Sequence, residues 1–465
     1  MSRWTLLEAD ERLARWDCCD VSIAIIGFGH IGGSMGSLLA SKGFPVVGID
    51  KAAGILQAFE AGECPFEEPG LAAVLARAKE RHTLRVTADY TEIKSSDVVL
   101  IVVGTPLDED HGPILDHLKS ATRSLGKVLQ PGMLILLKST VPPLTTQQLV
   151  RPILEEASGM EAGVDFGLAF SPERVDEGNV LEGLYGIPVV VGGVNTASSE
   201  LAVEFWTRTL GVETMVVPDP TTAELVKLAD NQWIDLNIAL ANEIALLSDA
   251  IGVDAMEVIK AANSLPKGQH WVNILYPSIG VGGYCLTKDP WFLHRLGAQR
   301  DIDLQTPQCS RAVNEQMPSV TVQRVISCLR AHQKDPAQAR VTILGLSFKN
   351  DTGDTRSTPA GPIIQMLEDH GCKVQAYDPL VSENQARALT GSAIAPDIQA
   401  AVEGADVVAC LSCHEEFRSA NLSQLKERTR ENCWFLDGRL GFDPLSVKAA
   451  GFDYTAIGGH CHAGD

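Results

Sequence analysis

A glycine-rich turn between two apolar segments limits the fold more than any other feature of this chain. Residues 21–50 run from an apolar stretch, "VSIAII", through Gly27, Gly29 and Gly32 into a helical pattern and a second apolar stretch, "PVVGID". The turn fits G-x-G-x-x-G, whose glycines allow a tight turn and bring backbone close to a pyrophosphate at a helix N-terminus. The alternation continues through "DVVLIVVGTP" and "MLILLKST". Strands spaced by helices predict a parallel, doubly wound α/β sheet.

The acid that ends the second strand suggests which dinucleotide binds. Asp50 follows Gly32 by 18 residues, where a carboxylate can accept hydrogen bonds from both ribose hydroxyls. A 2′-phosphate would be repelled there, so Asp50 favours NAD over NADP, although the adjacent Lys51 argues the other way. The alternative is a glycine turn that serves packing alone. A nicotinamide cofactor would imply hydride transfer.

The rest of the chain divides into segments of different pattern. From Thr222 to Ile251 there is no Gly or Pro and the apolar positions cover more than one face, which predicts a long helix buried on several sides. Beyond Gln333, "RVTILGLSFK", "KVQAYDP" and "CWFLDGR" predict a second, smaller parallel α/β domain. We expect an N-terminal extension (1–20), a Rossmann-like NAD-binding domain (21–210), a central helical domain (211–330) and a C-terminal Rossmann-like domain (331–465).

Charge and composition exclude several classes of partner. The 465 residues carry a net charge of −21, which repels nucleic acid and anionic membranes at long range. No apolar run approaches the roughly 18 residues of a membrane span, and "MSRWTLLEADERLARWDCCD" is too acidic for a signal peptide. We therefore expect a cytoplasmic protein. The 11 cysteines are scattered and odd in number, unlike a disulfide framework.

We expect no metal site. Cys410 and Cys413 have C-x-x-C spacing, but no second pair stands at zinc spacing, so core thiols are favoured over ligands. His460, Cys461 and His462 near the C-terminus could hold adventitious metal, and a frayed terminus is the preferred interpretation.

One cysteine stands in a setting that suits a nucleophile. In "IGVGGYCLTKDP", Cys285 follows a glycine run and precedes Lys288 and Asp289. Glycines let a backbone approach a ligand closely, and a nearby cation favours the reactive thiolate. For this cysteine alone, a buried thiol beside a turn is the more common case. The decision depends on the other polar groups of the chain.

Further polar groups could complete a reaction centre. Lys227 and Asn231 are spaced i, i+4 on the predicted long helix, so both project from one face, where a cation and an amide suit a developing oxyanion. Thr140, Glu173 and Glu177 lie in "KSTVPP" and "FSPERVDEGN", which follow predicted strands on the side where open parallel sheets bind ligands. A carboxylate beside a reacting carbonyl could order or deprotonate water. A lysine at the rim of a buried helix and a solvated glutamate are the structural alternatives.

The motifs, in their order, resemble the nucleotide-sugar 6-dehydrogenases, a family that includes UDP-glucose, GDP-mannose and UDP-N-acetylhexosamine dehydrogenases. The resemblance spans about Val21 to Gly441 and is carried by "GFGHIG", "GTP", "STVP", "SPERVDEGN", "VKLADN", "GVGGYCLTKDP", "GLSFKNDTGDTR" and "DGR". It implies the four-electron oxidation of a sugar C6 alcohol to a carboxylate with two NAD in succession, in polysaccharide biosynthesis. It also implies that Cys285 is the nucleophile, which forms a thiohemiacetal and then a thioester.

The resemblance assigns roles by position. It implies a catalytic set of Cys285, Lys227, Asn231, Asp289, Thr140, Glu173 and Glu177, in which Lys227 and Asn231 stabilise oxyanions and Asp289 and Thr140 handle protons or water. It implies cofactor contacts at Gly27, Gly29, His30, Ile31, Gly32, Asp50, Lys51, Gly104, Thr105, Pro106 and Thr140, and at Arg356 across a domain cleft. It implies substrate contacts at Glu173, Arg174, Val175, Lys227, Asn231, Tyr276, Gly282, Lys349 and Arg439, with Lys349 at the phosphate. The loop of Lys349 and Arg356 could otherwise be a solvated charged loop.

The sugar is the open question. "SPERVDEGN" resembles the N-acetylhexosamine branch, whereas "LTKDP" and "DTGDTR" lean toward the UDP-glucose branch. We favour a UDP-N-acetylhexosamine, with UDP-glucose or GDP-mannose as alternatives. A one-step hydroxyacid dehydrogenase would have no use for Cys285 or a second α/β domain, and a non-catalytic nucleotide-sugar sensor would not need the nucleophile. The apolar surface of the long helix predicts a homodimer or a higher homo-oligomer.

Overall fold

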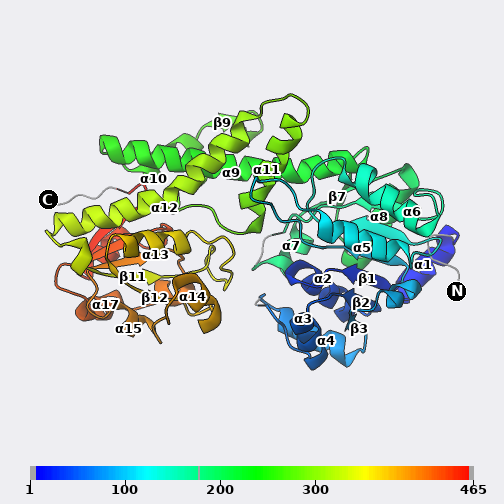
Figure 1. The fold of residues 1–465 in the computed structure, drawn as a ribbon, viewed down its shortest axis with the longest axis horizontal. Coiled ribbons are helices and arrows are strands. Elements are labelled where there is room, and N and C mark those ends of the chain that lie inside the picture. Colours follow the sequence, from blue (N-terminus) through cyan, green and yellow to red (C-terminus); the bar gives the residue numbers. More distant parts are fainter. Residues whose placement is uncertain (1–6, 67, 176–177, 460–465) are drawn as a thin grey trace. The chain divides into compact units, whose positions relative to one another are not determined.

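The computed structural model describes residues 7–66, 68–175 and 178–459 (Figure 1). The chain separates into two compact units. The first extends to Asp230 and includes Arg295–Asp301, and the second comprises Asn231–His294 and the residues from Ile302 onward.

The first unit is built on an eight-stranded sheet in the order β3-β2-β1-β4-β5-β6-β7-β8. Its strands are β1 (Ile23–Ile26), β2 (Val46–Ile49), β3 (Leu84–Thr87), β4 (Val98–Ile101), β5 (Leu134–Leu137), β6 (Gly167–Phe170), β7 (Val189–Gly193) and β8 (Thr214–Val216). β1 pairs in parallel with both β2 and β4, so the strand order reverses at β1. The pairing of β6 with β7 is antiparallel, and the other pairings are parallel.

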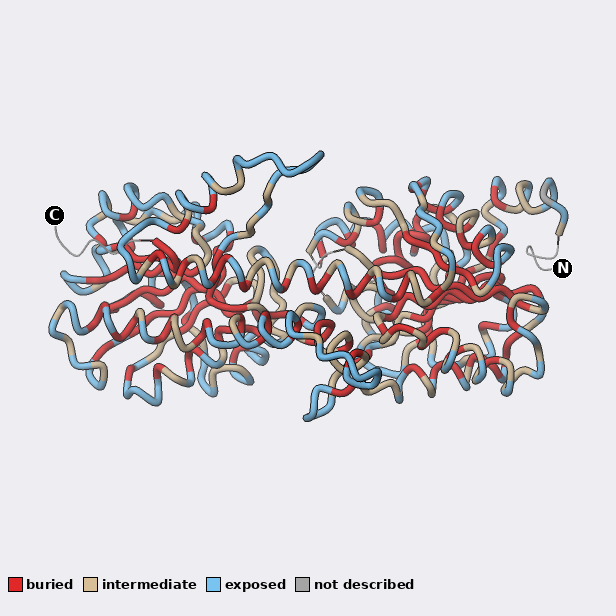
Figure 2. The backbone as a smooth tube through the Cα atoms, turned by 90° about the horizontal axis from the view of Figure 1, so that it is seen from above, coloured by how far each residue is buried: buried red, intermediate tan, exposed pale blue. Residues whose placement is uncertain are grey.

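Helices pack against this sheet and explain its apolar composition. Every residue of β1, β4, β5 and β6 is buried, as expected for parallel strands covered on both faces, and Figure 2 shows this burial along the sheets. The helices are α1 (Ala9–Asp17), α2 (His30–Ser41), α3 (Ala53–Ala61), α4 (Leu71–Glu80), α5 (Asp116–Gly126), α6 (Arg151–Ser158), α7 (Val180–Gly186) and α8 (Thr196–Leu210), with short turns η2 (Tyr90–Ser95) and η3 (Thr146–Val150).

The N-terminal extension contains a helix that packs on the first unit. Trp16, in α1, is only 4% exposed and meets the rings of Phe44 and Phe205 at centroid distances of 5.9 and 6.3 Å. Its indole Nε1 donates to Glu204 at 2.7 Å, and Arg15 pairs with Asp97 at 2.9 Å. Helix α1 is therefore part of the core of this unit.

Trp16→Ala is expected to lower the free energy of unfolding of the first unit by about 3–5 kcal/mol, because it removes a large buried ring and leaves a cavity. Denaturant unfolding followed by circular dichroism measures the change. Glu11→Ala, at an exposed position of the same helix, serves as the control and should change the value by less than about 0.5 kcal/mol. A loss below about 1 kcal/mol in the Trp16 variant would contradict the packing described.

A long helix contributes residues to both units. α9 extends from Pro220 to Ile251, two residues longer at its start than the apolar pattern predicts. Proline is favoured at the first helical position, because its missing N–H would have no intrahelical partner there.

The second unit surrounds a smaller parallel sheet in the order β12-β11-β13-β14-β15. Its strands are β11 (Arg340–Leu344), β12 (Lys373–Tyr377), β13 (Val407–Cys410), β14 (Trp434–Asp437) and β15 (Asp453–Ala456), with β9 (Pro266–Lys267) and β10 (His270–Trp271) in a separate hairpin. Its helical elements are α10 (Ala255–Asn263), α11 (Tyr284–Ala298, of which the part from Arg295 onward belongs to the first unit), α12 (Gln305–Ala331), η4 (Pro336–Gln338), α13 (Ala360–Asp369), α14 (Glu383–Thr390), α15 (Ile398–Val402), α16 (Glu415–Arg418), α17 (Leu422–Arg428) and α18 (Pro444–Ala449).

The predicted fold class is confirmed. The protein is α/β, with one mainly parallel and one fully parallel sheet and a helical region between them in sequence that includes α9. The antiparallel step from β6 to β7 is a detail that the alternating pattern does not distinguish. The domain boundaries at residues 20, 210 and 330 stay predictions. Within the described ranges, no helix combines the length and the apolar character that crossing a membrane requires.

Candidate active site

The glycine turn of the first unit is tightly packed at two of its glycines and leaves space for a ligand at the third. A Cβ on Gly27, which has φ +93°, would lie 2.6 Å from the carbonyl oxygen of Val102, and one on Gly32 would lie 2.0 Å from that of Gly27. A Cβ on Gly29 would meet nothing within 4 Å. Two glycines are thus required by packing, and the third leaves the start of α2, at His30 and Ile31, accessible to a pyrophosphate.

Asp50 is fixed in place at the end of β2. Its carboxylate accepts hydrogen bonds from the backbone N–H of Phe28, inside the glycine turn, at 2.8 Å and from that of Ala52 at 2.9 Å. The neighbouring Lys51 is exposed, and its Nζ lies 3.5 Å from Nδ1 of His117. The turn and this acid fit the pyrophosphate and ribose of a dinucleotide.

The loops after the next two strands belong to the same edge of the sheet. Gly104, Thr105 and Pro106 follow β4, and Thr140 follows β5. The buried Thr105 hydroxyl donates to the carbonyl oxygen of Thr140 at 2.6 Å and ties the two loops together. A Cβ on Gly104 would meet nothing within 4 Å, so this loop also leaves room beside its backbone. The structure therefore brings these predicted cofactor residues together at the carboxyl ends of the strands.

Glu68 is a buried carboxylate that sequence reasoning missed. It pairs with Nε2 of His30 at 2.8 Å and accepts the backbone N–H groups of Gly178 at 3.0 Å and Val180 at 2.7 Å. Burial alone would raise the pKa of Glu68, but the bonds to His30 and the backbone outweigh it and lower the pKa. Glu68 thereby joins the glycine turn to the end of the predicted substrate loop, at Gly178, and to the start of α7, at Val180.

Glu173 is held inside its own turn. One carboxylate oxygen accepts the backbone N–H groups of Arg174 at 2.8 Å and Val175 at 2.9 Å, and the other lies 3.2 Å from Nζ of Lys138. Lys138 is buried over the ring of Trp206, and burial lowers its pKa although Glu173 acts in the opposite direction. These five residues line one small pocket.

Two further predicted residues of this region have different outcomes. Arg174 pairs through Nε with Asp230 at 2.8 Å, so its guanidinium is anchored to α9. Glu177 lies outside the described residues.

The contact of Lys138 with Glu173 could not be predicted from the sequence, because a lysine at the end of an apolar strand carries no sign of its distant partner.

Cys285 occupies the first turn of α11 and is exposed. Asp289, one turn later on the same face, is fully buried, and its carboxylate accepts a hydrogen bond from the amide of Asn231 at 2.5 Å and forms an ion pair with Lys288. Asn231 lies on α9, one turn after the buried Lys227. The structure thus joins Asn231 and Asp289 directly, with Cys285 one turn away.

The glycine run before Cys285 packs against the loop that follows β11. A Cβ on Gly282 would lie 2.4 Å from Cβ of Phe348 and 2.9 Å from the carbonyl oxygen of Ser357. The N–H of Gly283 donates to the carbonyl of Arg356 at 2.9 Å. The Arg356 guanidinium lies 4.9 Å from the ring centroid of Tyr284 and pairs with Asp354 at 2.9 Å. A Cβ on Gly283, which has φ +80°, would lie 2.8 Å from the ring of Phe348, so both glycines are needed for close contact with this loop.

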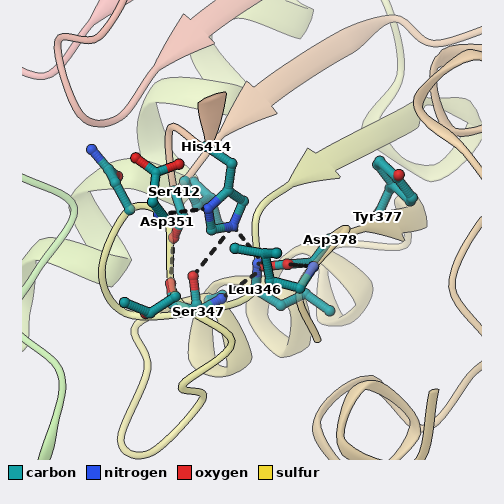
Figure 3. Close-up of polar contacts among 12 residues, drawn as sticks. Leu346, Ser347, Asp351, Tyr377, Asp378, Ser412 and His414 are labelled. Carbon is teal, nitrogen blue, oxygen red and sulfur yellow. Dashed lines mark hydrogen bonds and ion pairs between the residues drawn. The ribbon is translucent and has the colours of Figure 1, made fainter. Parts of the chain in front are cut away.

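Three successive residues after β13 hold the beginning of the same loop (Figure 3). The Ser412 hydroxyl donates to the carbonyl of Ser347, the N–H of Cys413 to Oδ1 of Asn350 at 2.8 Å, and the N–H of Asp351 to Nδ1 of His414 at 2.8 Å. We call these contacts the 412–414 latch. Asp351 has φ +57°, a strained conformation for a residue with a side chain, and the latch helps to hold it.

A buried histidine and a buried aspartate hold the residues of the latch in place. Nε2 of His414 lies 3.1 Å from Asp378, which also accepts the N–H of Leu346 at 2.7 Å (Figure 3). Because Nδ1 of His414 accepts a hydrogen bond from the backbone N–H of Asp351, Nε2 is the nitrogen that donates to Asp378. The loop of Lys349 is thereby fixed at its start by a continuous polar network.

The predicted C-terminal substrate residues have different settings. Arg439 donates to the carbonyl oxygens of Phe348 at 2.6 Å and Leu411 at 2.9 Å, and burial lowers its pKa to about 10, which leaves it cationic at neutral pH. Lys349 is partly exposed in the latched loop. Tyr276 is 64% exposed in the segment that leads to the glycine run. Arg439 and Lys349 thus belong to one loop region, whereas no described contact joins Tyr276 to it.

Comparisons with known proteins agree over nearly the whole chain. The domain models of the UDP-glucose/GDP-mannose dehydrogenase family match residues 21–210 (NAD binding domain), 221–316 (central domain) and 342–444 (UDP binding domain). A UDP-N-acetyl-D-mannosamine dehydrogenase of Pyrococcus horikoshii is 34% identical over 436 residues, which cover 94% of this chain and 99% of the relative. The chain belongs to the UDP-glucose/GDP-mannose dehydrogenase family.

Solved structures of dehydrogenases from this family share its fold. A UDP-D-ManNAc dehydrogenase from Pyrococcus horikoshii matches with a TM-score of 0.85 at 33% identity, covering 94% of this chain and 99% of that one. A UDP-glucose dehydrogenase from Pyrobaculum islandicum matches with 0.83 at 28% identity, covering 95% and 98%. The protein is thus an NAD-dependent nucleotide-sugar dehydrogenase, and its NAD-binding and UDP-binding domains confirm the predicted family, reaction class and cofactor.

Cysteine and histidine clusters of the dehydrogenase do not form a described metal centre. Cys410 and Cys413 are both buried in the core around β13. Across residues 7–66, 68–175 and 178–459, no group of three or more His, Cys, Asp or Glu side chains could hold a metal ion. The predicted adventitious site at His460, Cys461 and His462 lies outside the described residues.

The Asp378 carboxylate should make the UDP-binding domain sensitive to acid. Burial alone would raise the pKa of Asp378, but its bonds to His414 and to backbone N–H groups outweigh burial and lower the pKa. The folded state therefore binds fewer protons than the unfolded chain below the usual pKa of about 3.9. The resulting stabilisation is complete above that pH and is lost as the pH falls through the folded-state pKa.

Asp378→Asn removes this titration. The stability difference between the wild-type dehydrogenase and the variant is expected to be constant above about pH 5 and to shrink as the pH falls toward 3. Denaturant unfolding at each pH measures it, and Asp369→Asn, at an exposed position of α13, is the control. A difference that does not depend on pH would contradict the assignment.

Proposed function

We propose that the dehydrogenase oxidises the C6 hydroxyl of a UDP-N-acetylhexosamine to the carboxylate, through a thiohemiacetal and a thioester on Cys285. The observation that carries the proposal is the exposed thiol in the first turn of α11, one turn from the buried Asp289–Asn231 pair. The thiol lies at the N-terminus of α11, where the helix dipole stabilises negative charge, and the ammonium of Lys288 in the same turn is paired with Asp289. An exposed thiol in this setting suits attack on a carbonyl.

The reaction balances as two oxidations and one hydrolysis. The alcohol first loses a hydride and a proton and becomes an aldehyde. The Cys285 thiolate then adds to the aldehyde carbon to give the alkoxide of the thiohemiacetal, which loses a second hydride and becomes a thioester. Water cleaves the thioester to the acid and regenerates the thiol. NAD bound at the glycine turn supplies the acceptor for each hydride.

The surrounding residues have distinct tasks in this scheme. The ammonium of Lys227 and the amide of Asn231 stabilise the oxyanions that form when sulfur or water adds to the carbonyl. The bonds of Asp289 to Asn231 and Lys288 support a role in orienting that amide, and the family resemblance adds proton handling together with Thr140. Glu173 and Glu177 flank the sugar and the hydrolytic water. The inward bonds of Glu173 support a role in shaping its turn, with Arg174 and Val175 beside the substrate.

The nucleotide is assigned to the C-terminal loop region. Lys349 and Arg439 supply cations for the diphosphate and its neighbours, and Arg356 for the cofactor side of the site. Tyr276 and Gly282 complete the proposed substrate contacts. The division into an N-terminal extension (1–20), an NAD-binding domain (21–210), a central helical domain (211–330) and a C-terminal domain (331–465) stays a proposal.

The choice of sugar rests on the relatives and on one loop. Relatives named UDP-N-acetyl-D-mannosamine dehydrogenase match almost the entire chain, and "SPERVDEGN" agrees with that branch. UDP-glucose is the second candidate, because a UDP-glucose dehydrogenase structure is nearly as similar in fold and "LTKDP" agrees with that branch. GDP-mannose is a more distant alternative.

A panel of UDP- and GDP-sugars tests both parts of the proposal. We expect UDP-N-acetylhexosamines to give the highest kcat/KM, and each sugar consumed to yield two NADH and one carboxylate, detected by absorbance and mass spectrometry. A preference for UDP-glucose would reassign the sugar. One NADH per sugar would overturn the thioester route and favour a one-step dehydrogenase. Binding of a UDP-sugar without NADH formation would favour the sensor.

We infer a homodimer or higher homo-oligomer that assembles through α9. Its exposed apolar side chains Trp233, Leu236, Leu240, Leu247 and Ile251 recur at helical spacing along one side. A row of this kind is uncommon on a monomer and marks an interface. Light scattering is expected to give at least twice the monomer mass of 49.9 kDa, and a monodisperse monomer at working concentration would reject the inference. The cytoplasmic location stays a prediction.

A further inference from the structure

A proline in the nucleophile helix leaves one backbone acceptor without its helical donor. Pro290 lies inside α11 and has no N–H to donate to the carbonyl four residues earlier. That carbonyl belongs to Leu286, the residue that follows Cys285. The helix turn that carries the thiol therefore needs a hydrogen-bond donor from elsewhere.

A buried arginine supplies this donor. Arg311, on α12, is 2% exposed, and its Nη1 donates to the Leu286 carbonyl oxygen at 3.2 Å. The same Nη1 donates to Asp235, on α9, at 2.7 Å, and the other guanidinium nitrogens lie 3.3 Å from Glu315. One guanidinium thereby joins α9 and α12 to the turn of α11 that contains Cys285.

The surroundings of Arg311 restrict how it can move. Asp235 is fully buried and accepts a second bond, from the amide of Asn314, at 2.9 Å on the same oxygen. A buried cation needs both a counterion and acceptors for its N–H groups, and here they come from fixed helices. A planar guanidinium can satisfy a carboxylate and a carbonyl together, which a lysine cannot do with the same geometry.

We propose that Arg311 is a positioning residue for the nucleophile, which acts by holding the Leu286 carbonyl that Pro290 leaves open. The inference rests on the proposed role of Cys285. It goes beyond that role, because Arg311 is not proposed to touch substrate or cofactor. Arg311 would act only through the orientation and the reactivity of the thiol. If the Arg311–Asp235 ion pair only stabilised the core, its contribution to stability would be the same whether residue 290 is proline or alanine.

Restoring the missing donor provides the test. Pro290→Ala returns an N–H to the α11 ladder, so the Leu286 carbonyl no longer depends on Arg311. We compare Arg311→Lys in the wild-type and Pro290→Ala backgrounds by the rate at which iodoacetamide alkylates Cys285 between pH 6 and 9. Peptide mass spectrometry follows this site alone. kcat and KM are measured in parallel.

The expected result is a coupling between the two positions. In the wild-type background, Arg311→Lys should slow alkylation of Cys285 and lower kcat, each by about tenfold, with little change in KM. In the Pro290→Ala background, the same substitution should lower both rates by less than about threefold. Equal effects in both backgrounds, or no effect on alkylation, would overturn the inference. If Arg311→Lys is recovered unfolded, folding yield takes the place of alkylation. Rescue by Pro290→Ala then supports the inference, and failure to rescue overturns it.

A second ion pair between the same two helices is the matched control. Arg324 on α12 pairs with Asp249 on α9, and its Nη1 also donates to the Thr455 hydroxyl on β15 at 3.4 Å. Arg324→Lys should lower the melting temperature and leave the alkylation rate of Cys285 within about twofold of wild type. Activity that persists without Cys285 would refute the proposed function, whereas uncoupled alkylation rates would refute only the role of Arg311.

Discussion

Cys285→Ala is expected to lower the rate of uronic acid formation by at least about 10³-fold, because the covalent route to the carboxylate needs the sulfur. Binding of the UDP-sugar should stay within about threefold of wild type, since the variant removes a small exposed group. The first oxidation does not require the thiol, so slow formation of one NADH per sugar, with the aldehyde as product, is compatible with the scheme. NADH absorbance, mass spectrometry of products and calorimetric binding measure these quantities.

Another exposed thiol of the same unit provides the control. Cys309→Ala, in the first turns of α12, changes a cysteine of similar exposure and should leave the rate unchanged within about twofold. Acid formation by Cys285→Ala at a tenth of the wild-type rate or more would exclude an acyl-enzyme on this sulfur. The proposed function would then fail, even though the family assignment would stand.

Gly282→Ala is expected to lower kcat/KM by about 100-fold, because a Cβ at this position would lie 2.4 Å from Phe348 and 2.9 Å from the Ser357 carbonyl. Backbone must move to relieve such contacts, and overpacking of this kind costs about 1–3 kcal/mol or more. The turn before Cys285 and the loop of Lys349 would shift apart. Steady-state kinetics and UDP binding measure the effect.

Gly186→Ala is the corresponding control, because a Cβ on Gly186 meets nothing within 4 Å and its backbone is not in the left-handed region. It should leave kcat/KM within about twofold of wild type. If Gly282→Ala were as active as Gly186→Ala, the contact between the glycine run and the loop after β11 would not matter for turnover.

The fold was largely predictable, because the apolar strands and the glycine turn are encoded locally. "VSIAII" and "DVVLIVV" are continuous apolar runs, as strands buried on both faces require, and they form β1 and β4. The α9 pattern lacks helix breakers over 30 residues from Thr222 to Ile251, so its type and extent were readable. The antiparallel pairing of β6 with β7 was not, since the side-chain period of a strand is the same in both directions.

The candidate site was predictable where residues neighbour one another on one element, and not where partners are distant in sequence. Cys285 and Asp289 share a helix face, as do Lys227 and Asn231, and such spacing can be read directly. Lys138 and Glu173, or Arg311 and the Leu286 carbonyl, meet only in the folded chain. Pro290 was the one available signal for the latter, because a proline inside a helix always leaves a carbonyl to be satisfied.

The 412–414 latch constrains how the length of the chain can vary during evolution. Ser412, Cys413 and His414 bond in register to Ser347, Asn350 and Asp351, so the loss or gain of one residue on either side would misalign all three bonds at once. Point substitutions can be absorbed one contact at a time, whereas insertions and deletions here cannot. Homologues that keep this loop should therefore vary in residue type at these positions far more readily than in spacing.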